Sequence, residues 1–226
     1  MKSIKGTYST VLISACFFVA CSGDEVVVED SVHEYHESNQ LPNVQPIPKE
    51  EFVELTSDKA FLSKSKELNG LKYDARPVPT DLMALRILGD DYNEERLDSL
   101  RKELQGIAYF EFRIEAPGSL TEVAKVGLTS MAEYQERIEY MAFEMQNNYS
   151  LQIDAESKEC FIYHFERTYN IAPYSTFLLG FELSEEEEHK ERTLVFDDDV
   201  FGAGRLKFKW TPNEFNWVPK IATNEN

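Results

Sequence analysis

Hydrophobic and polar residues alternate with a period of two along much of the second half of the chain. In the clearest run, 107–115, Phe110, Phe112 and Ile114 alternate with Tyr, Glu and Arg. Successive side chains of a strand point to opposite faces, so this run predicts a half-buried strand. Further strands are predicted over 151–154, 159–169, 176–183, 192–196 and 205–210. Short turns join most of them, which favours antiparallel neighbours.

The first half of the chain has helical spacing instead. A helix is predicted over 57–68, with Ser57 as its cap and the Asn69-Gly70 pair as its end. A second helix is predicted over 81–88, where Thr80 precedes an acidic first turn and Gly89 follows the end. Pro77 and Pro79 should hold the chain extended before it.

Two more helices are predicted from capping-box spacing. Asp91 and Glu94 have this spacing before the buried stripe Leu97, Leu100 and Leu104. Ser130 and Glu133 have it before the longest helix. The stripe of that helix is Met131, Tyr134, Ile138, Met141, Ala142 and Met145. A methionine-rich stripe can form a binding groove, but core spacing favours a buried face.

These elements predict an α+β fold over residues 49–226, organised as a single domain. We expect a mostly antiparallel sheet of about five or six strands with helices packed on one face. The sequence contains 15 Phe, 11 Tyr and 2 Trp, which supply large apolar areas for a core.

The N-terminal residues have a different pattern. Lys2 and Lys5 precede an apolar run over 11–20, and Cys21 follows Val19-Ala20. Ten helical residues span only about 15 Å, half of a bilayer core, so the run is typical of a secretory signal. It resembles a bacterial lipoprotein signal, with residues 1–20 removed and Cys21 acylated. That pattern prefers Leu three residues before the cysteine, where this chain has Phe18.

Two alternatives to acylation at Cys21 remain open. Cys16 follows Ile13-Ser14-Ala15, which fits the pattern better locally, but leaves an apolar run of about five residues, below the seven or so of a signal core. An ordinary cleaved signal without a lipid is the other alternative. Acyl chains on Cys21 would anchor the chain to a membrane, because each buried methylene contributes about 0.8 kcal/mol.

Residues 21–48 are polar and acidic, and Pro42, Pro46 and Pro48 end the segment, which predicts a disordered tether. The whole chain has 41 acidic and 23 basic residues and a formal net charge of −18. Such a chain repels nucleic acid and anionic headgroups, so a nucleic-acid partner is excluded. We expect the acyl chains, rather than the surface charge, to provide membrane attachment.

The cysteines leave no intrachain disulfide if Cys16 departs with the signal and Cys21 is acylated, because Cys160 is then alone. Cys160, His164 and Glu166 share one face of the expected strand 159–169. Four strand residues span about 13 Å, however, which is too far for a Cys–His dyad. A half-buried sheet face is the favoured interpretation, and no catalytic residue and no cofactor are predicted.

The acidic run Asp197-Asp198-Asp199 before Gly202 raises the question of a calcium site. Its acids are consecutive, whereas a calcium loop alternates its ligands and ends on a glutamate at the twelfth position, where this chain has Phe208. A tight turn between strands is therefore favoured over a metal site.

The lipoprotein signal, the acidic residues after Cys21 and the aromatic strands resemble uncharacterised outer-membrane or surface lipoproteins of the Bacteroidota. The segments 109–114, Tyr-Phe-Glu-Phe-Arg-Ile, and 163–167, Tyr-His-Phe-Glu-Arg, carry this resemblance. It implies a location in the bacterial cell envelope, lipid-anchored to the outer membrane on its periplasmic or surface face. It implies no catalytic activity.

We therefore expect a non-catalytic binding or accessory subunit of an outer-membrane protein assembly, with an outer-membrane or periplasmic protein as partner. The candidate interaction surface is aromatic and consists of Trp210, Phe215, Trp217 and Tyr174. One alternative is a glycan-binding accessory lipoprotein that uses exposed aromatic side chains. A second is a periplasmic or surface hydrolase, which would need a deep pocket with convergent carboxylates.

Overall fold

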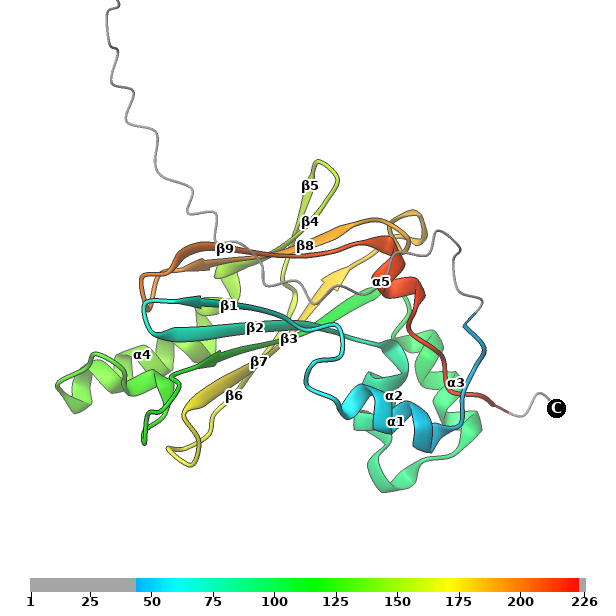
Figure 1. Ribbon diagram of the computed structural model, residues 1–226, viewed down its shortest axis with the longest axis horizontal. Helices are drawn as coiled ribbons and strands as arrows, with labels where there is room; N and C mark the ends of the chain where they lie inside the picture. The colour runs from blue at the N-terminus through cyan, green and yellow to red at the C-terminus, as the bar shows by residue number, and fades with distance from the viewer. Residues whose placement is uncertain (1–43, 224–226) are drawn as a thin grey trace, which may run out of the picture.

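Two antiparallel β-sheets lie face to face in a computed structural model that describes residues 44–223 (Figure 1). The first sheet has the strand order β1-β2-β3-β7-β6 and the second has the order β5-β4-β8-β9. The strands are β1 Lys64–Leu68, β2 Leu71–Val78, β3 Ile107–Glu115, β4 Tyr149–Ile153, β5 Glu156–Glu159, β6 Ile162–Glu166, β7 Tyr174–Glu182, β8 Arg192–Asp198 and β9 Gly204–Trp210. The expected signal, Cys16, Cys21 and most of the tether lie outside the described residues.

The α-helices lie in three places around the two sheets. They are α1 Lys49–Ser57, α2 Thr80–Leu88, α3 Glu94–Glu103, α4 Met131–Phe143 and α5 Pro212–Asn216. Short 3₁₀ turns span Gly89–Asp91, Val123–Lys125, Met145–Asn148 and Glu185–Glu187. Helices α1, α2 and α3 gather on the right of Figure 1, α4 lies on the left, and α5 follows the end of β9.

An aromatic core holds the two sheets together. On the inner face of β3, Phe110, Phe112 and Ile114 are fully buried, as their alternation predicts. The Phe112 ring centroid lies 4.9 Å from that of Phe196 and 5.7 Å from that of Phe208, both on the opposite sheet. Rings at these separations and tilts attract one another beyond the area that they bury.

Helices α1, α2 and α3 cover part of the outer face of the first sheet. Phe52 and Leu97 are fully buried there, in a cluster that includes Tyr109 of β3. Glu111 also joins α2 to the sheet, because its carboxylate pairs with Arg76 at 2.9 Å and with Arg86 at 2.8 Å. The α+β class, the antiparallel pairing and the packing of helices on a sheet face are confirmed.

The number of strands and sheets is larger than expected. The described residues form nine strands in two sheets, whereas one sheet of five or six strands was predicted. The expected strand 159–169 is interrupted at Cys160 and Phe161. The residues before this break pair with β4, and those after it pair with β7 of the other sheet. A break between two polar-alternating segments carries no strong sequence signal, because alternation continues on both sides of it.

The helix expected over 57–68 is wrong. A helix ends at Ser57, and Lys64–Leu68 forms β1, paired with β2 in a hairpin that sets Leu68 opposite Leu71. Asn69 and Gly70 form its two-residue turn with φ values of 54° and 75°. Asn-Gly is the preferred sequence for such a turn, so the pair marks a hairpin rather than a helix end.

Helix α4 begins with the capping box predicted at Ser130 and Glu133. Tyr134, Met141 and Met145 are buried in the main core, whereas Met131 is 66 % exposed. The stripe is therefore a core face from Tyr134 onward, and Met131 is not part of it. For α2 and α3, the residues before the helix are Pro79 and Asn93 in place of the expected Thr80 and Asp91, and Asn93 accepts a hydrogen bond from the Arg96 amide.

The acidic segment 185–188 contains one buried carboxylate. Glu187 is 6 % exposed and pairs with Lys158 at 2.8 Å. Its other oxygen accepts hydrogen bonds from the amide and hydroxyl of Ser184. The Lys158 hydrogen bond, followed by those of Ser184, lowers the pKa of Glu187 to about 2.

This lowered pKa predicts an acid-dependent loss of stability. An unfolded glutamate has a pKa of about 4.3, so the contribution of Glu187 is complete above that pH and disappears as the pH falls toward 2. We expect the free energy of unfolding of Glu187→Gln, measured with denaturant, to depend less steeply on pH in this window than that of the wild type. The exposed neighbour provides the control Glu186→Gln, and equal slopes for wild type and Glu187→Gln would contradict the prediction.

Candidate functional site

A cavity of about 220 Å³ opens at one end of the two sheets, beneath the C-terminal segment. Ala108 of β3 and Arg192 of β8 contribute to it from the two sheets, and Thr80 contributes from the start of α2. Phe215, Val218, Pro219 and Lys220 line it from the C-terminal segment. We call residues 215–221 the C-terminal strap.

The strap is held in place by backbone pairing with the first described residues. Ile47 and Ile221 form a parallel bridge. The Ile47 amide donates to the Lys220 carbonyl at 2.9 Å, and the Ala222 amide donates to the Ile47 carbonyl at 2.8 Å. The two segments are separated by almost the whole described chain, so folding of the domain is needed to build this wall of the cavity.

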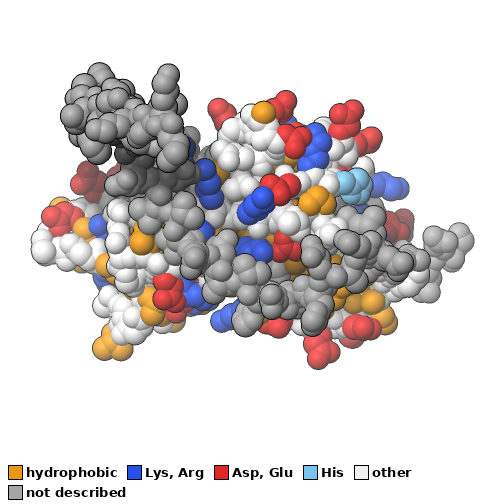
Figure 2. Space-filling model, turned by 45° about the horizontal axis from the view of Figure 1, so that its top comes forward, with side chains coloured by type: hydrophobic (Ala, Val, Ile, Leu, Met, Phe, Trp, Pro, Cys, Tyr) orange, Lys and Arg blue, Asp and Glu red, His pale blue; other side chains and the backbone are white. Residues whose placement is uncertain are grey.

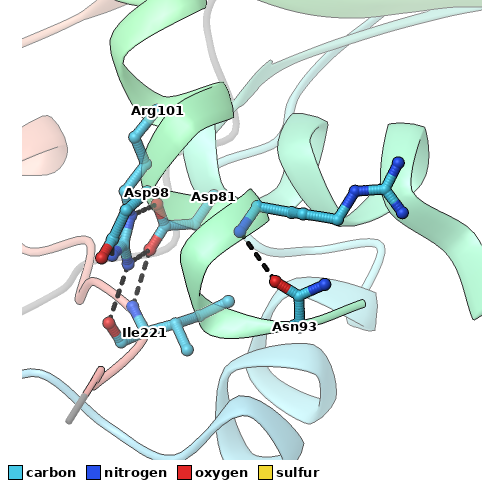
Figure 3. A network of polar contacts seen from close by, with 6 residues as sticks. Asp81, Asn93, Asp98, Arg101 and Ile221 are labelled. Atoms are coloured by element: carbon cyan, nitrogen blue, oxygen red, sulfur yellow. Dashed lines mark hydrogen bonds and ion pairs between the residues drawn. The ribbon is translucent and has the colours of Figure 1, made fainter. Parts of the chain in front are cut away.

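A buried ion pair fixes the strap from below, as Figure 3 shows. Arg101 of α3 donates to both carboxylate oxygens of Asp81 at 2.7 Å and to the Ile221 carbonyl at 2.8 Å. Asp81 also accepts from the Ile221 amide at 2.7 Å. The hydrogen bonds to Asp81 raise the pKa of Arg101 above its ordinary value. Both backbone groups of Ile221 are therefore satisfied by one bidentate pair.

Arg192 is another arginine near the cavity, more deeply buried than Arg101, and its surroundings are different. It occupies an inward position of β8, on the same face as Leu194 and Phe196, and is 9 % exposed. One guanidinium nitrogen donates to the Glu188 carbonyl at 2.6 Å, and Nε has no hydrogen-bond partner. The Phe215 ring lies under the guanidinium at 4.2 Å.

No carboxylate of the described residues forms an ion pair with Arg192. Burial lowers the pKa of its guanidinium to about 10, which still leaves it charged at neutral pH. Burial of a charge without a countercharge costs free energy. The cavity wall therefore contains a cation that forms no ion pair with the described part of the chain, although the charges of Glu188 and Glu187 favour its charged form.

Four titratable side chains line the cavity: Asp81, Tyr109, Arg192 and Lys220. It contains no cysteine, histidine or serine, and its one carboxylate, Asp81, is occupied by Arg101 and the Ile221 amide. Across residues 44–223, no group of three His, Cys, Asp or Glu side chains is arranged to hold a metal ion. The arrangement is suited to binding an anion.

The four residues of the expected aromatic surface do not lie together. Phe215 lines the cavity, and Trp217 beside it is 50 % exposed. Trp210 is fully buried, so its expected exposure is wrong. It shares the inner face of β9 with Phe208, and its indole donates to the Leu62 carbonyl at 2.7 Å. Strand period places Trp210 and Phe208 on one face, which the alternation with Lys209 could have indicated.

Tyr174, the fourth of these residues, lies at the start of β7. Arg113 of β3 stacks on its ring at 3.6 Å, and the same guanidinium pairs with Glu115 at 2.7 Å. Tyr174 is half-buried by this contact. It is therefore part of a polar cluster on the first sheet and does not extend the surface at the strap.

Cys160, His164 and Glu166 were expected on one face of one strand, but only His164 and Glu166 belong to a strand, β6. Cys160 precedes β6, is 6 % exposed and donates its thiol to the Ile162 carbonyl at 3.1 Å. Burial raises the pKa of the thiol to about 11. The thiol is therefore protonated near neutral pH and a poor nucleophile, while His164 and Glu166 are exposed on β6.

The acidic run 197–199 has a structural role in the turn between β8 and β9. Asp198 accepts hydrogen bonds from the amides of Val200, Phe201 and Ala203 and from the Tyr73 hydroxyl. Asp197 pairs with Arg205 at 2.7 Å, and Asp199 accepts from Asn148 at 2.8 Å. Each carboxylate has a different protein partner, as the turn interpretation requires.

A separate group of exposed apolar side chains lies on two neighbouring loops. Leu120 is 97 % exposed on the loop after β3, and Ile171 and Tyr169 are 89 % and 70 % exposed on the loop before β7. Asn170 joins the loops by accepting from the Glu122 amide at 3.2 Å. These loops are at the lower left of Figure 1, away from the strap. On the face in Figure 2, hydrophobic side chains are instead scattered among charged ones.

The sequence reading missed Asp81, Arg101 and Arg192 as residues of a site. Arg192, Leu194 and Phe196 are spaced two residues apart, which indicates an inward arginine. The two-residue period is hard to recognise, however, because Val195 at an intervening position is also apolar. Asp81 and Arg101 belong to expected helices, and nothing local indicates that they meet Ile221, which is 120 residues from Arg101.

Comparison of the chain with protein-family models, curated proteins and solved structures gives no significant match. Within the described residues, no helix is both long enough and apolar enough to cross a bilayer.

The ion pair beneath the strap predicts a large effect of Arg101→Ala. The substitution leaves the Asp81 carboxylate buried without its cation, so we expect the free energy of unfolding to fall by about 3 kcal/mol. Faster amide exchange in the strap should accompany this loss. Arg96 lies on the same helix with 55 % of its side chain exposed, so Arg96→Ala is the control and should cost little. Equal losses in the two variants would refute the role of the pair.

Proposed function

We propose that the protein is a membrane-anchored lipoprotein of a bacterial cell envelope, attached to the outer membrane by acyl chains on Cys21. Its folded domain acts as a non-catalytic binding or accessory subunit of an outer-membrane protein assembly. The observation that carries this proposal is the cavity under the strap, where Arg192 is buried without an ion-pair partner among the described residues and its Nε has no hydrogen-bond partner there.

Two further features support a role in binding. The apolar run before Cys21 is too short to span a bilayer and ends in the residues of a lipoprotein signal. Leu120, Tyr169 and Ile171 expose apolar surface on adjacent loops, a property that favours protein contacts. The domain thus offers one recessed polar site and one protruding apolar group to its surroundings.

The glycan-binding and hydrolase alternatives receive less support. Stacking on sugars needs exposed rings, but Trp210 is buried and Tyr174 is covered by Arg113, which leaves Trp217 alone of the three. A hydrolase needs convergent carboxylates, and the only one in the cavity lining is the Asp81 that Arg101 neutralises.

The anchor is tested by blocking lipoprotein signal processing with globomycin. We expect a larger precursor to accumulate for the wild type, and also for Cys16→Ala, because Cys21 carries the lipid. Cys21→Ala should show no lipid labelling and no response to the inhibitor. If Cys16→Ala loses the lipid while Cys21→Ala keeps it, the anchoring cysteine is the other one.

The binding role is tested by purifying tagged protein from gently solubilised membranes. We expect an envelope protein to be recovered with it in stable proportion. The control Cys21→Ala separates contacts that need membrane attachment from those that the domain makes by itself. Repeated recovery of the protein alone would contradict the accessory role.

A further inference from the structure

Arg192 is a buried cation at an inward position of β8, where the free-energy cost of burying a charge must be offset by its surroundings. The adjacent positions on this face, Leu194 and Phe196, are apolar and fully buried, so another apolar residue would suit the same packing. The nearest acidic residues, Glu188 and Glu187, favour its charge electrostatically but form no ion pair with it. Glu187 pairs with Lys158, and Glu188 offers its backbone carbonyl. The chain has 41 acidic residues, so the missing countercharge is not due to a shortage of carboxylates.

A second cation lines the same cavity. Lys220 lies on the strap, is exposed, and forms no ion pair with the described residues. Asp81 is the only acidic residue in the lining, and Arg101 compensates its charge at 2.7 Å. The lining therefore contributes two cations besides the Asp81 carboxylate that Arg101 pairs with, in a chain of net charge −18, and this favours an anion as ligand.

The remaining walls determine what kind of anion fits. Ala108, Val78, Val218 and Pro219 are apolar, and Phe215 presents a ring face. The cavity of about 220 Å³ corresponds to roughly seven water volumes, or about one amino-acid residue. Thr80 and Tyr109 are the remaining polar residues of these walls. A guanidinium matches a carboxylate through two parallel hydrogen bonds, so one carboxylate on an apolar group suits the site.

We infer that the cavity under the C-terminal strap binds a carboxylate carried on an apolar group of about one residue, through Arg192 and Lys220. Two kinds of ligand carry a carboxylate on an apolar group: the C-terminus of a partner polypeptide that ends in an apolar residue, and a small free carboxylic acid. This inference rests on the binding role proposed above, and it does not require acylation of Cys21.

The test is calorimetric titration of the full-length protein in detergent with four probes. These are 3-phenylpropionate, its amide, the peptide Gly-Gly-Phe with a free carboxylate, and the same peptide as an amide. We expect both acids to bind and both amides to bind at least about tenfold more weakly. Tighter binding of the peptide acid assigns the site to a polypeptide C-terminus, and tighter binding of 3-phenylpropionate assigns it to a small acid.

Arg192→Met keeps the volume of the side chain and removes its charge. We expect it to weaken binding of either acid by about tenfold or more without lowering the melting temperature, because no countercharge is left behind. Arg205→Met, at the other end of the same strand pair, is the matched control and should bind as the wild type does. The inference is overturned if no acid binds to the wild type, if amides bind as well as acids, or if Arg192→Met binds undiminished.

An independent variant covers the case in which Arg192→Met fails to fold. Lys220 is exposed, so Lys220→Glu should fold normally and weaken acid binding about tenfold, while Lys102→Glu on α3 should not. Equal binding by the two variants counts against the inference. Acid binding with no recovered partner refutes the assembly role alone, whereas a recovered partner with no acid binding refutes the cavity inference alone.

Discussion

Contacts between aromatic rings across the two sheets are the interaction on which the rest of the structure depends. Phe112 lies at their centre, and its ring meets Phe196, Phe208 and Tyr149 of the opposite sheet at 4.9, 5.7 and 5.2 Å. The one cysteine in the described residues, Cys160, is free, so packing rather than a disulfide joins the sheets there. The cavity lies at the end of this core. There the inward positions of β3 and β8 are occupied by Ala108 and Arg192 instead of large rings.

Two arginines near the strap, Arg101 and the more deeply buried Arg192, show how similar side chains take opposite roles. Arg101 donates to both oxygens of Asp81, and these hydrogen bonds raise its pKa. Arg192 has a carbonyl and a ring as neighbours, and burial lowers its pKa. In the first arrangement Arg101 and Asp81 form an ion pair, so each charge has a partner. In the second arrangement Arg192 lines the cavity and has no ion-pair partner among the described residues.

Local patterns predicted the elements that local forces determine. The alternation around Phe112 gave β3, and the Ser130–Glu133 box gave the start of α4. The hairpin at Asn69 was missed because the same pair can end a helix. The cavity could not be predicted, because its contacts join distant residues. Arg101 meets Ile221 across 120 residues, and Trp210 meets Leu62 across 148. Such contacts follow from how the sheets and helices pack, which no local window contains.

The bridge between Ile47 and Ile221 has a mechanical consequence. Tension applied to the chain ahead of residue 44 is resisted first by two backbone hydrogen bonds, from Ile47 to Lys220 and from Ala222 to Ile47. It next reaches α1 through Pro48, and the sheets only after that. A pull on the N-terminal side therefore strains the C-terminal strap, which lines the cavity beside Arg192, before it disturbs the aromatic layers.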